Sequence, residues 1–215
     1  MERKHLLIAL CLVILVLSLA EAAAVKDPPR DPEQALRERL WEEVYQQGGT
    51  TLYCREAFEG RHMLLTESPV YFLNQARQHL RCGTRRKCLR EDETYRALVM
   101  DLHNVFPAQA RFEHRRRGPH YSEIDQAVSR GECGERNDFG RFEPPPHARG
   151  TVARALFHMH SRYQLPLPGD LNTLRQWHRD HPPGEEEQRR NRTIEQLQGF
   201  DNPFISNPSL AEQLL

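Results

Sequence analysis

The chain has 215 residues, and its 30 lysines and arginines are balanced by 30 aspartates and glutamates, so its formal net charge is zero. This length suits one domain with a sizeable hydrophobic core. A balanced charge excludes a protein that binds nucleic acid through overall positive charge. Any attraction to phosphate must therefore come from local clusters of arginine.

The N-terminal residues are typical of an export signal. A basic pair precedes an unbroken apolar run at 6–17, and small residues allow cleavage after Ala22 or Ala24. We therefore expect residues 1–24 to be a signal peptide, with a retained anchor as the alternative. The run is short for a membrane span and no other stretch approaches one. The mature chain is expected in the periplasm or outside the cell, without stable membrane association.

Four cysteines remain once the signal peptide is removed: Cys54, Cys82, Cys88 and Cys133. An even number of cysteines in an exported chain favours disulfides over a zinc site. Four cysteines permit three connectivities, and we prefer Cys82 with Cys88 and Cys54 with Cys133. Closing the smaller loop contributes about 2 to 3 kcal/mol by loop-entropy arithmetic.

The mature chain divides into three parts by composition. We predict a polar leader and a first amphipathic helix for residues 25–49, a main domain for residues 50–208 and a tail for residues 209–215. Three runs of β-forming residues predict strands: 50–54, 63–65 and 70–73.

A helix followed by a basic run is predicted between Cys88 and Arg117. Four residues share one face of this helix: Tyr95, Leu98, Val99 and Leu102. Pro107 then ends or kinks it. Polar side chains gather at and after this point: Asp101, His103, Asn104, Glu113 and His114. Such oxygen and imidazole groups suit a hard metal ion, and the arginines that follow suit the phosphates on which that ion would act.

Three further helices are predicted in the second half of the chain. The first runs from Arg149 to Tyr163, because apolar residues recur there at spacings of three and four. Asp170 caps the second, which stops before Pro182. The third opens with a run of glutamates at Glu185 and places arginines behind them, an order that suits the helix dipole.

Several uncommon sequence words occur in one order over about 53–208, nearly the whole mature chain. They are CGTRRKC at 82–88, DLHNVFP at 101–107, RGTVARA at 149–155 and NPF at 202–204. In this order they resemble the endonuclease I family of secreted and periplasmic nucleases. Several uncommon words in one order are a far more specific signal than any single motif.

The resemblance implies a fold and an activity for residues 50–208. The fold is α+β and predominantly helical, with a ββα-metal finger-like core packed against several helices. The activity is metal-dependent hydrolysis of phosphodiester bonds in DNA or RNA with little sequence specificity. The implied cofactor is Mg²⁺ or another divalent cation, and a monomer is expected.

The same resemblance assigns roles to individual residues. It implies Glu67, Asn104 and Glu113 as metal ligands and Arg85 as the group that steadies the phosphate. In the absence of the family histidine, we expect His103 or His114 to act as a substitute general base. The implied nucleic-acid contacts are Arg86, Lys87, Arg115, Arg116, Arg117, Arg149 and Arg154.

Two positions depart from the family pattern. The family strand reads Glu-His-Val-x-Pro, and its histidine activates water, but residues 66–72 contain no histidine. Aligned on Glu67, Ser68 takes the place of the base; aligned on Val70, Pro69 takes the place of the base and Ser68 replaces the acid. The metal-binding Asn of the family aligns with Glu113. Because a positioned base supplies about 100- to 10,000-fold in rate, weak cleavage is expected. The alternative is an inactive nuclease fold that binds nucleic acid or a protein partner.

Overall fold

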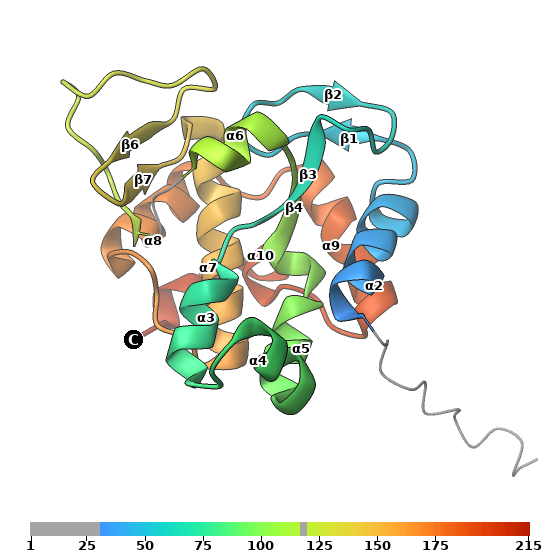
Figure 1. Cartoon of the computed structure of the whole chain (residues 1–215). Helices are drawn as coiled ribbons and strands as arrows, with labels where there is room; N and C mark the ends of the chain where they lie inside the picture. Colours follow the sequence, from blue (N-terminus) through green and yellow to red (C-terminus); the bar gives the residue numbers. More distant parts are fainter. Residues whose placement is uncertain (1–30, 117–119) are drawn as a thin grey trace, which may run out of the picture. The chain divides into compact units, whose positions relative to one another are not determined.

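The computed structural model of the chain describes residues 31–116 and 120–215. The expected signal peptide and Arg117 lie outside the described residues. Residues Asp31–Leu215 belong to one unit (Figure 1). Helices predominate over short strands in this unit, so the predicted α+β and mainly helical class is confirmed.

The first half of the unit alternates short helices with short strands. Its elements are α2 (Pro32–Glu38), η1 (Arg39–Val44), β1 (Gly49–Thr50), β2 (Ala57–Phe58), β3 (Leu65–Pro69), α3 (Leu73–Leu80), α4 (Arg85–Glu91), α5 (Glu93–Val99), η2 (Leu102–Asn104), β4 (Val105–Gln109) and α6 (Ala110–Arg115). The strands pair as β1 with β2 and β3 with β4, both antiparallel.

The second half contains a small sheet followed by the longest helices. Its elements are β5 (His120–Tyr121), β6 (Arg136–Asp138), β7 (Arg141–Glu143), η3 (Pro146–Ala148), α7 (Arg149–Tyr163), α8 (Leu171–Asp180), α9 (Glu185–Gln198), α10 (Pro203–Ser206) and η4 (Pro208–Gln213). The sheet has the order β5-β7-β6. None of the helices in residues 31–116 and 120–215 has the length and apolar character needed to span a bilayer.

The three helices predicted from periodicity are confirmed as α7, α8 and α9. Asp170 caps α8 as predicted, since its side chain accepts a hydrogen bond from the backbone N–H of Thr173 at 2.9 Å. Gly199 ends α9 in a left-handed conformation (φ 79°), which glycine adopts without steric cost. These elements rest on local signals, which explains why the sequence predicts them well.

The strands β3 and β4, together with helix α6, form a strand–strand–helix unit, which we call the ββα unit. Its second strand was predicted wrongly. We expected a helix up to Pro107, but α5 ends at Val99 and the chain is extended from Val105 to Gln109. Proline is tolerated in β4 because a two-stranded pair consists only of edge strands. Leu52 N–H donates to the carbonyl of Pro107 at 3.0 Å on the other edge.

The β3–β4 pair lies between two hydrophobic cores. Directly opposed residues share a face of the pair, and Leu65 and Val105 belong to the smaller core with Trp41. Phe106 and Ala108 belong to the larger core, which also includes much of α7. Residues next to each other on β3 therefore point toward different parts of the molecule.

Two disulfides connect the chain in the preferred pairing, Cys54–Cys133 and Cys82–Cys88. The smaller one joins the segment after α3 to α4. Helix α4 begins inside the loop that this disulfide closes, at Arg85. Thr84 caps this helix by accepting a hydrogen bond from the N–H of Lys87 at 3.2 Å.

Candidate functional site

The ββα unit brings together two polar side chains at the positions that depart from the family pattern. Ser68 lies on the β3 face that points to the larger core, and Glu113 lies on α6. Ser68 Oγ donates to Glu113 Oε2 at 2.6 Å. Ser68 is fully buried, so its hydroxyl is committed to this contact. In neither alignment does the place expected for the base hold a proton acceptor, because Ser68 donates its hydroxyl hydrogen and Pro69 has no polar side chain.

Arg116 completes this cluster from the residue that follows α6. Its Nε and Nη2 donate to the two carboxylate oxygens of Glu113, at 3.0 and 2.9 Å. Nη2 also donates to the carbonyl of Pro69 at 2.7 Å, and Nη1 donates to Tyr121 Oη at 3.0 Å. The side chain of Arg116 has no exposed surface, whereas that of Glu113 is 22% exposed. We call Ser68, Glu113, Arg116 and Tyr121 the ββα centre.

The ionisation of the ββα centre follows from these contacts. Burial disfavours the charged form of Arg116, but the oxygens of Tyr53, Tyr121 and Glu113 outweigh it and raise the pKa of Arg116 above its ordinary value. Burial also raises the pKa of Tyr121 well above its ordinary value, so its phenol stays neutral. The centre thus holds one permanent cation beside one carboxylate.

Glu67, predicted as a metal ligand, lies on the other face of β3. Its Oε1 accepts a hydrogen bond from Trp41 Nε1 at 2.6 Å. Ion pairs with Arg37 (3.4 Å) and Arg61 (3.3 Å) hold the same carboxylate. Because side chains alternate along a strand, Glu67 faces away from Ser68 and Glu113.

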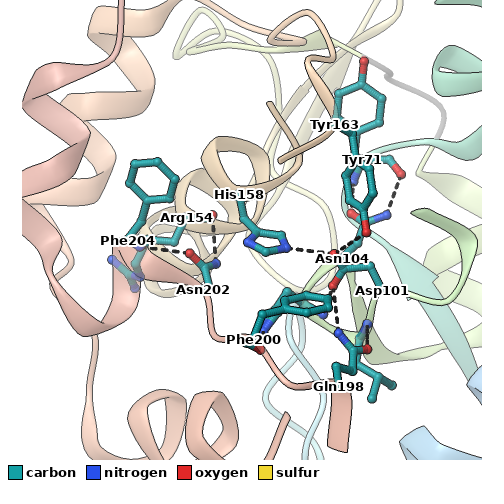
Figure 2. A network of polar contacts seen from close by, with 12 residues as sticks. Tyr71, Asp101, Asn104, Arg154, His158, Tyr163, Gln198, Phe200, Asn202 and Phe204 are labelled. Atoms are coloured by element: carbon teal, nitrogen blue, oxygen red, sulfur yellow. Dashed lines mark hydrogen bonds and ion pairs between the residues drawn. The ribbon is translucent and has the colours of Figure 1, made fainter. Parts of the chain in front are cut away.

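Asn104, the third predicted ligand, binds backbone (Figure 2). Its Oδ1 accepts from the N–H of Tyr71 at 2.6 Å, and its Nδ2 donates to the carbonyl of Tyr71 at 3.0 Å. The side chain is fully buried. This reciprocal pair fastens the chain that leaves β3 to the start of β4.

A second buried polar cluster surrounds Asp101 (Figure 2). Asp101 Oδ2 accepts from His158 Nε2 at 2.8 Å and from Tyr163 Oη at 2.9 Å. Its Oδ1 accepts from the N–H of His103 at 2.9 Å, and Gln198 Nε2 lies at 3.4 Å. Together with Asn104, these residues form what we call the Asp101 network. It connects η2 to α7 and to the end of α9.

The groups in the Asp101 network have strongly shifted pKa values. Burial alone would raise the pKa of Asp101, but the hydrogen bond and charge of His158 lower it to about 2. Burial lowers the pKa of His103 to about 3, so its imidazole is neutral near pH 7. His103 is only 1% exposed, so it does not reach a substrate at the surface.

The family implies a divalent metal, and the described residues do not fit one. The three predicted ligands lie on one face of β3, at the Tyr71 backbone and in the ββα centre. In residues 31–116 and 120–215, no group of three or more His, Cys, Asp or Glu side chains is arranged to hold a metal ion. Mg²⁺ requires a near-octahedral set of oxygens, whereas Arg116 and Ser68 bind both oxygens of Glu113.

Of the predicted nucleic-acid contacts, Arg116 is buried in the ββα centre and Arg117 lies outside the described residues, and the others separate into two groups. Arg86 and Lys87 are exposed on α4, where Arg85 pairs with Glu33. On α6, Arg115 pairs with Glu132 at 3.0 Å, and His114 is exposed beside Glu113. These groups can meet a ligand from solution.

The two arginines of α7 predicted to contact nucleic acid, Arg149 and Arg154, have partners within the protein. Arg154 is 1% exposed and pairs with Glu187 at 2.6 Å. Arg149 pairs with Glu143 and lies over the ring of Trp177. Both have structural partners that account for their charge.

Sequence reasoning did not identify Arg116 as the partner of Glu113. The signal was present, because residues three apart on a helix face the same side and Glu113 precedes Arg116 by three. The contribution of Tyr121 had no such signal, since the phenol arrives from a separate strand.

Two antiparallel strands, the second followed at once by a helix, within a disulfide-bonded and mainly helical unit, define an α+β protein with the ββα core that the resemblance implies. Residues 33–209 match the family Endonuclease I. The chain is 30% identical to an extracellular deoxyribonuclease of Aeromonas hydrophila, in an alignment that covers 93% of this chain and 96% of that protein. The chain therefore belongs to the Endonuclease I family.

Two other relatives align over shorter stretches. Endonuclease-1 of Buchnera aphidicola subsp. Acyrthosiphon pisum (strain APS) is 32% identical over 57% of this chain, and a periplasmic deoxyribonuclease of Aeromonas hydrophila is 34% identical over 57% of it. These alignments span about half of each relative, 50% and 54%.

Proposed function

We propose that the exported chain acts on DNA as an endonuclease of strongly reduced turnover. Family membership supports the substrate class and the reaction, and the relative aligned over 96% of its length is an extracellular deoxyribonuclease. The observation that carries reduced turnover is the lack of a proton acceptor at both candidate positions of the base, since Ser68 donates to Glu113 and Pro69 has no polar side chain. Loss of the base alone lowers the rate by about 100- to 10,000-fold.

The compartment and the binding surface are part of the same proposal. Two disulfides suit an oxidising compartment, either the periplasm or the medium. The exposed cations of α4 and α6, Arg86, Lys87 and Arg115, would contact the phosphate backbone of DNA as a monomer binds it. Phosphate contacts do not distinguish DNA from RNA, so both belong in the test.

The experiment follows nicking of supercoiled plasmid and cleavage of an RNA of known length by purified residues 25–215. Parallel reactions contain Mg²⁺, Mn²⁺ or a chelator. We expect slow plasmid nicking that falls further in a Glu113→Gln protein, because that residue lies in the ββα centre. The matched control is Glu59→Gln, which changes an exposed glutamate. Equal rates in wild type and Glu113→Gln would place the cleavage elsewhere or in a contaminant.

A double variant tests the origin of the slow rate. In the alignment on Glu67, Ser68→His with Glu113→Asn restores the residue types that the family pattern has at these positions. Faster nicking in the double variant than in wild type would support the proposal that the missing base limits turnover. Circular dichroism of the variant must match that of the wild type for the comparison to count.

A second candidate function is DNA binding without turnover. The observation that favours it is the bidentate contact of Arg116 with Glu113, which occupies the carboxylate. It predicts DNA retention without nicking, measured by fluorescence anisotropy at several salt concentrations. The log-log salt slope should fall by about 0.9 for each phosphate contact removed. Arg86→Ala should lower the slope, whereas Arg179→Ala on α8, which pairs with Glu212, should not.

A further inference from the structure

The contacts of Arg116 match the shape of a guanidinium group. Two of its nitrogens bind the two oxygens of Glu113, which is the planar fork geometry that suits arginine and carboxylate. The third nitrogen binds Tyr121, whose own hydroxyl donates to the carbonyl of Val70 at 2.6 Å. The ring of Phe72 lies 4.3 Å below the guanidinium carbon. Lysine has no fork to satisfy these positions.

The charge of the ββα centre is already balanced. Arg116 contributes one positive charge, Glu113 contributes one negative charge, and Ser68 and Tyr121 are neutral. The nearest acid along β3, Glu67, faces the other side and has its own cations. A divalent ion beside a buried guanidinium would place like charges in a region of low dielectric, which is strongly unfavourable.

We propose that the guanidinium group of Arg116 is the resident cation of the ββα centre, so the chain completes this centre without a divalent metal. The positive charge expected from a metal ion is supplied by the protein itself, from the residue directly after α6. The inference rests on the packing of Arg116 and Glu113, so it holds whether or not the chain cleaves DNA.

The first test is metal binding to the unmodified mature protein, measured by thermal unfolding and calorimetric titration with MgCl₂ and MnCl₂. A cation at 100 times its dissociation constant would raise the melting temperature by about 5 to 10 °C for a chain of this size. We expect no shift beyond that of NaCl at equal ionic strength, and no saturable heat. A saturable shift that disappears in Glu113→Gln would overturn the inference.

The second test removes the resident cation. Arg116→Ala leaves Glu113 unpaired beside a buried space of guanidinium size, so the melting temperature should fall. Guanidinium ion at low millimolar concentration should partly restore it, whereas the same ion should only lower the melting temperature of the wild type. NaCl at equal ionic strength is the salt control. Arg115→Ala, which changes the exposed neighbour that pairs with Glu132, should show no such rescue.

The outcomes separate clearly. Rescue of Arg116→Ala by guanidinium, together with a wild type that ignores Mg²⁺ and Mn²⁺, supports the inference. A folded Arg116→Ala protein that guanidinium does not restore would contradict it. Should that variant not fold, the titration of the wild type still decides, because it needs no substitution. Nicking is not a readout in either test, so failure of the proposed endonuclease activity leaves the result unchanged.

Discussion

The ββα centre and the Asp101 network both bind the backbone where the chain leaves β3, yet they differ in how closely they follow the family pattern. Half of the Asp101 network, namely Asp101, His103 and Asn104, comes from DLHNVFP, one of the sequence words that reveal the family. Its side chains bind one another and the backbone. The ββα centre keeps the strand–strand–helix backbone, but its polar residues depart from the family pattern at Ser68 and Glu113. The word DLHNVFP therefore stabilises the fold, whereas the positions that depart from the family pattern meet in the ββα centre.

The same comparison explains why the predicted site residues separate in the structure. Asn104 and His103 belong to a recognisable word, and this made them attractive as a ligand and a base. In the structure they fasten η2 and β4 to neighbouring segments. The following predictions test whether the Asp101 network stabilises the fold while the ββα centre has another role. They begin with the one that should have the largest effect.

Asp101→Ala should be the most damaging. It removes the acceptor of His158 and Tyr163 and leaves their polar atoms buried without a partner. Loss of a buried charged partner costs about 3 to 5 kcal/mol. Urea denaturation followed by circular dichroism measures the change. Asp180→Ala, at an exposed position, should change stability by less than about 0.5 kcal/mol. Similar losses of unfolding free energy in the two variants would show that the Asp101 network does not stabilise the fold.

Asn104→Asp should cost about 1 to 3 kcal/mol, because the carbonyl of Tyr71 loses its donor in a buried place. The substitution keeps an oxygen ligand and adds a negative charge. A metal ligand would therefore become stronger, and Mg²⁺ would offset the loss. We expect the same loss in Mg²⁺ and in chelator. Recovery of stability in Mg²⁺ but not in chelator would indicate that residue 104 is a metal ligand.

Stability should fall as the pH is lowered from about 6.5 toward 3. The folded state holds His103 neutral with a pKa of about 3, whereas the unfolded chain binds a proton below the ordinary value of 6.5. A difference of one proton corresponds to about 1.4 kcal/mol per pH unit. Asp101, with its pKa lowered to about 2 in the folded state, adds a loss only below its ordinary value of 3.8.

Variants of single histidines measure how much of this pH dependence of stability is due to His103. Burial lowers the pKa of His147, His178 and His181 as well, so part of the slope remains in any variant. His103→Gln should flatten the dependence of unfolding free energy on pH between 6 and 4. His114→Gln, at an exposed position on α6, should leave the slope of the wild type. An unchanged slope in His103→Gln would contradict the burial argument.

Ser68→Ala should have the smallest effect, about 1 kcal/mol or less. Glu113 loses one hydrogen bond but remains bound by both nitrogens of Arg116. Any nicking rate should stay within about twofold of the wild type, because a serine that donates to a carboxylate does not activate water. A rate that falls 100-fold or more would show that Ser68 is a catalytic residue and would contradict this prediction.

The sequence predicted those features that depend on local signals. The helices α7, α8 and α9 follow from periodic apolar residues, caps and a C-terminal glycine, all of which act within a few positions. It failed at β4, because the apolar spacing of Tyr95, Leu98 and Leu102 continues past the true end of the helix. Only pairing with β3, which lies about 40 positions earlier in the chain, makes Val105–Gln109 a strand.

By itself the sequence determined the family, the mainly helical class and the cysteines that pair. These follow from residue types, their order and their local spacing. The tertiary structure decided which polar side chains meet. Glu67 and Ser68 are neighbours in the chain but point to opposite faces of one strand, whereas Ser68 and Glu113 are 45 positions apart and share a hydrogen bond. Strand register and helix placement set these contacts, and both are products of long-range packing.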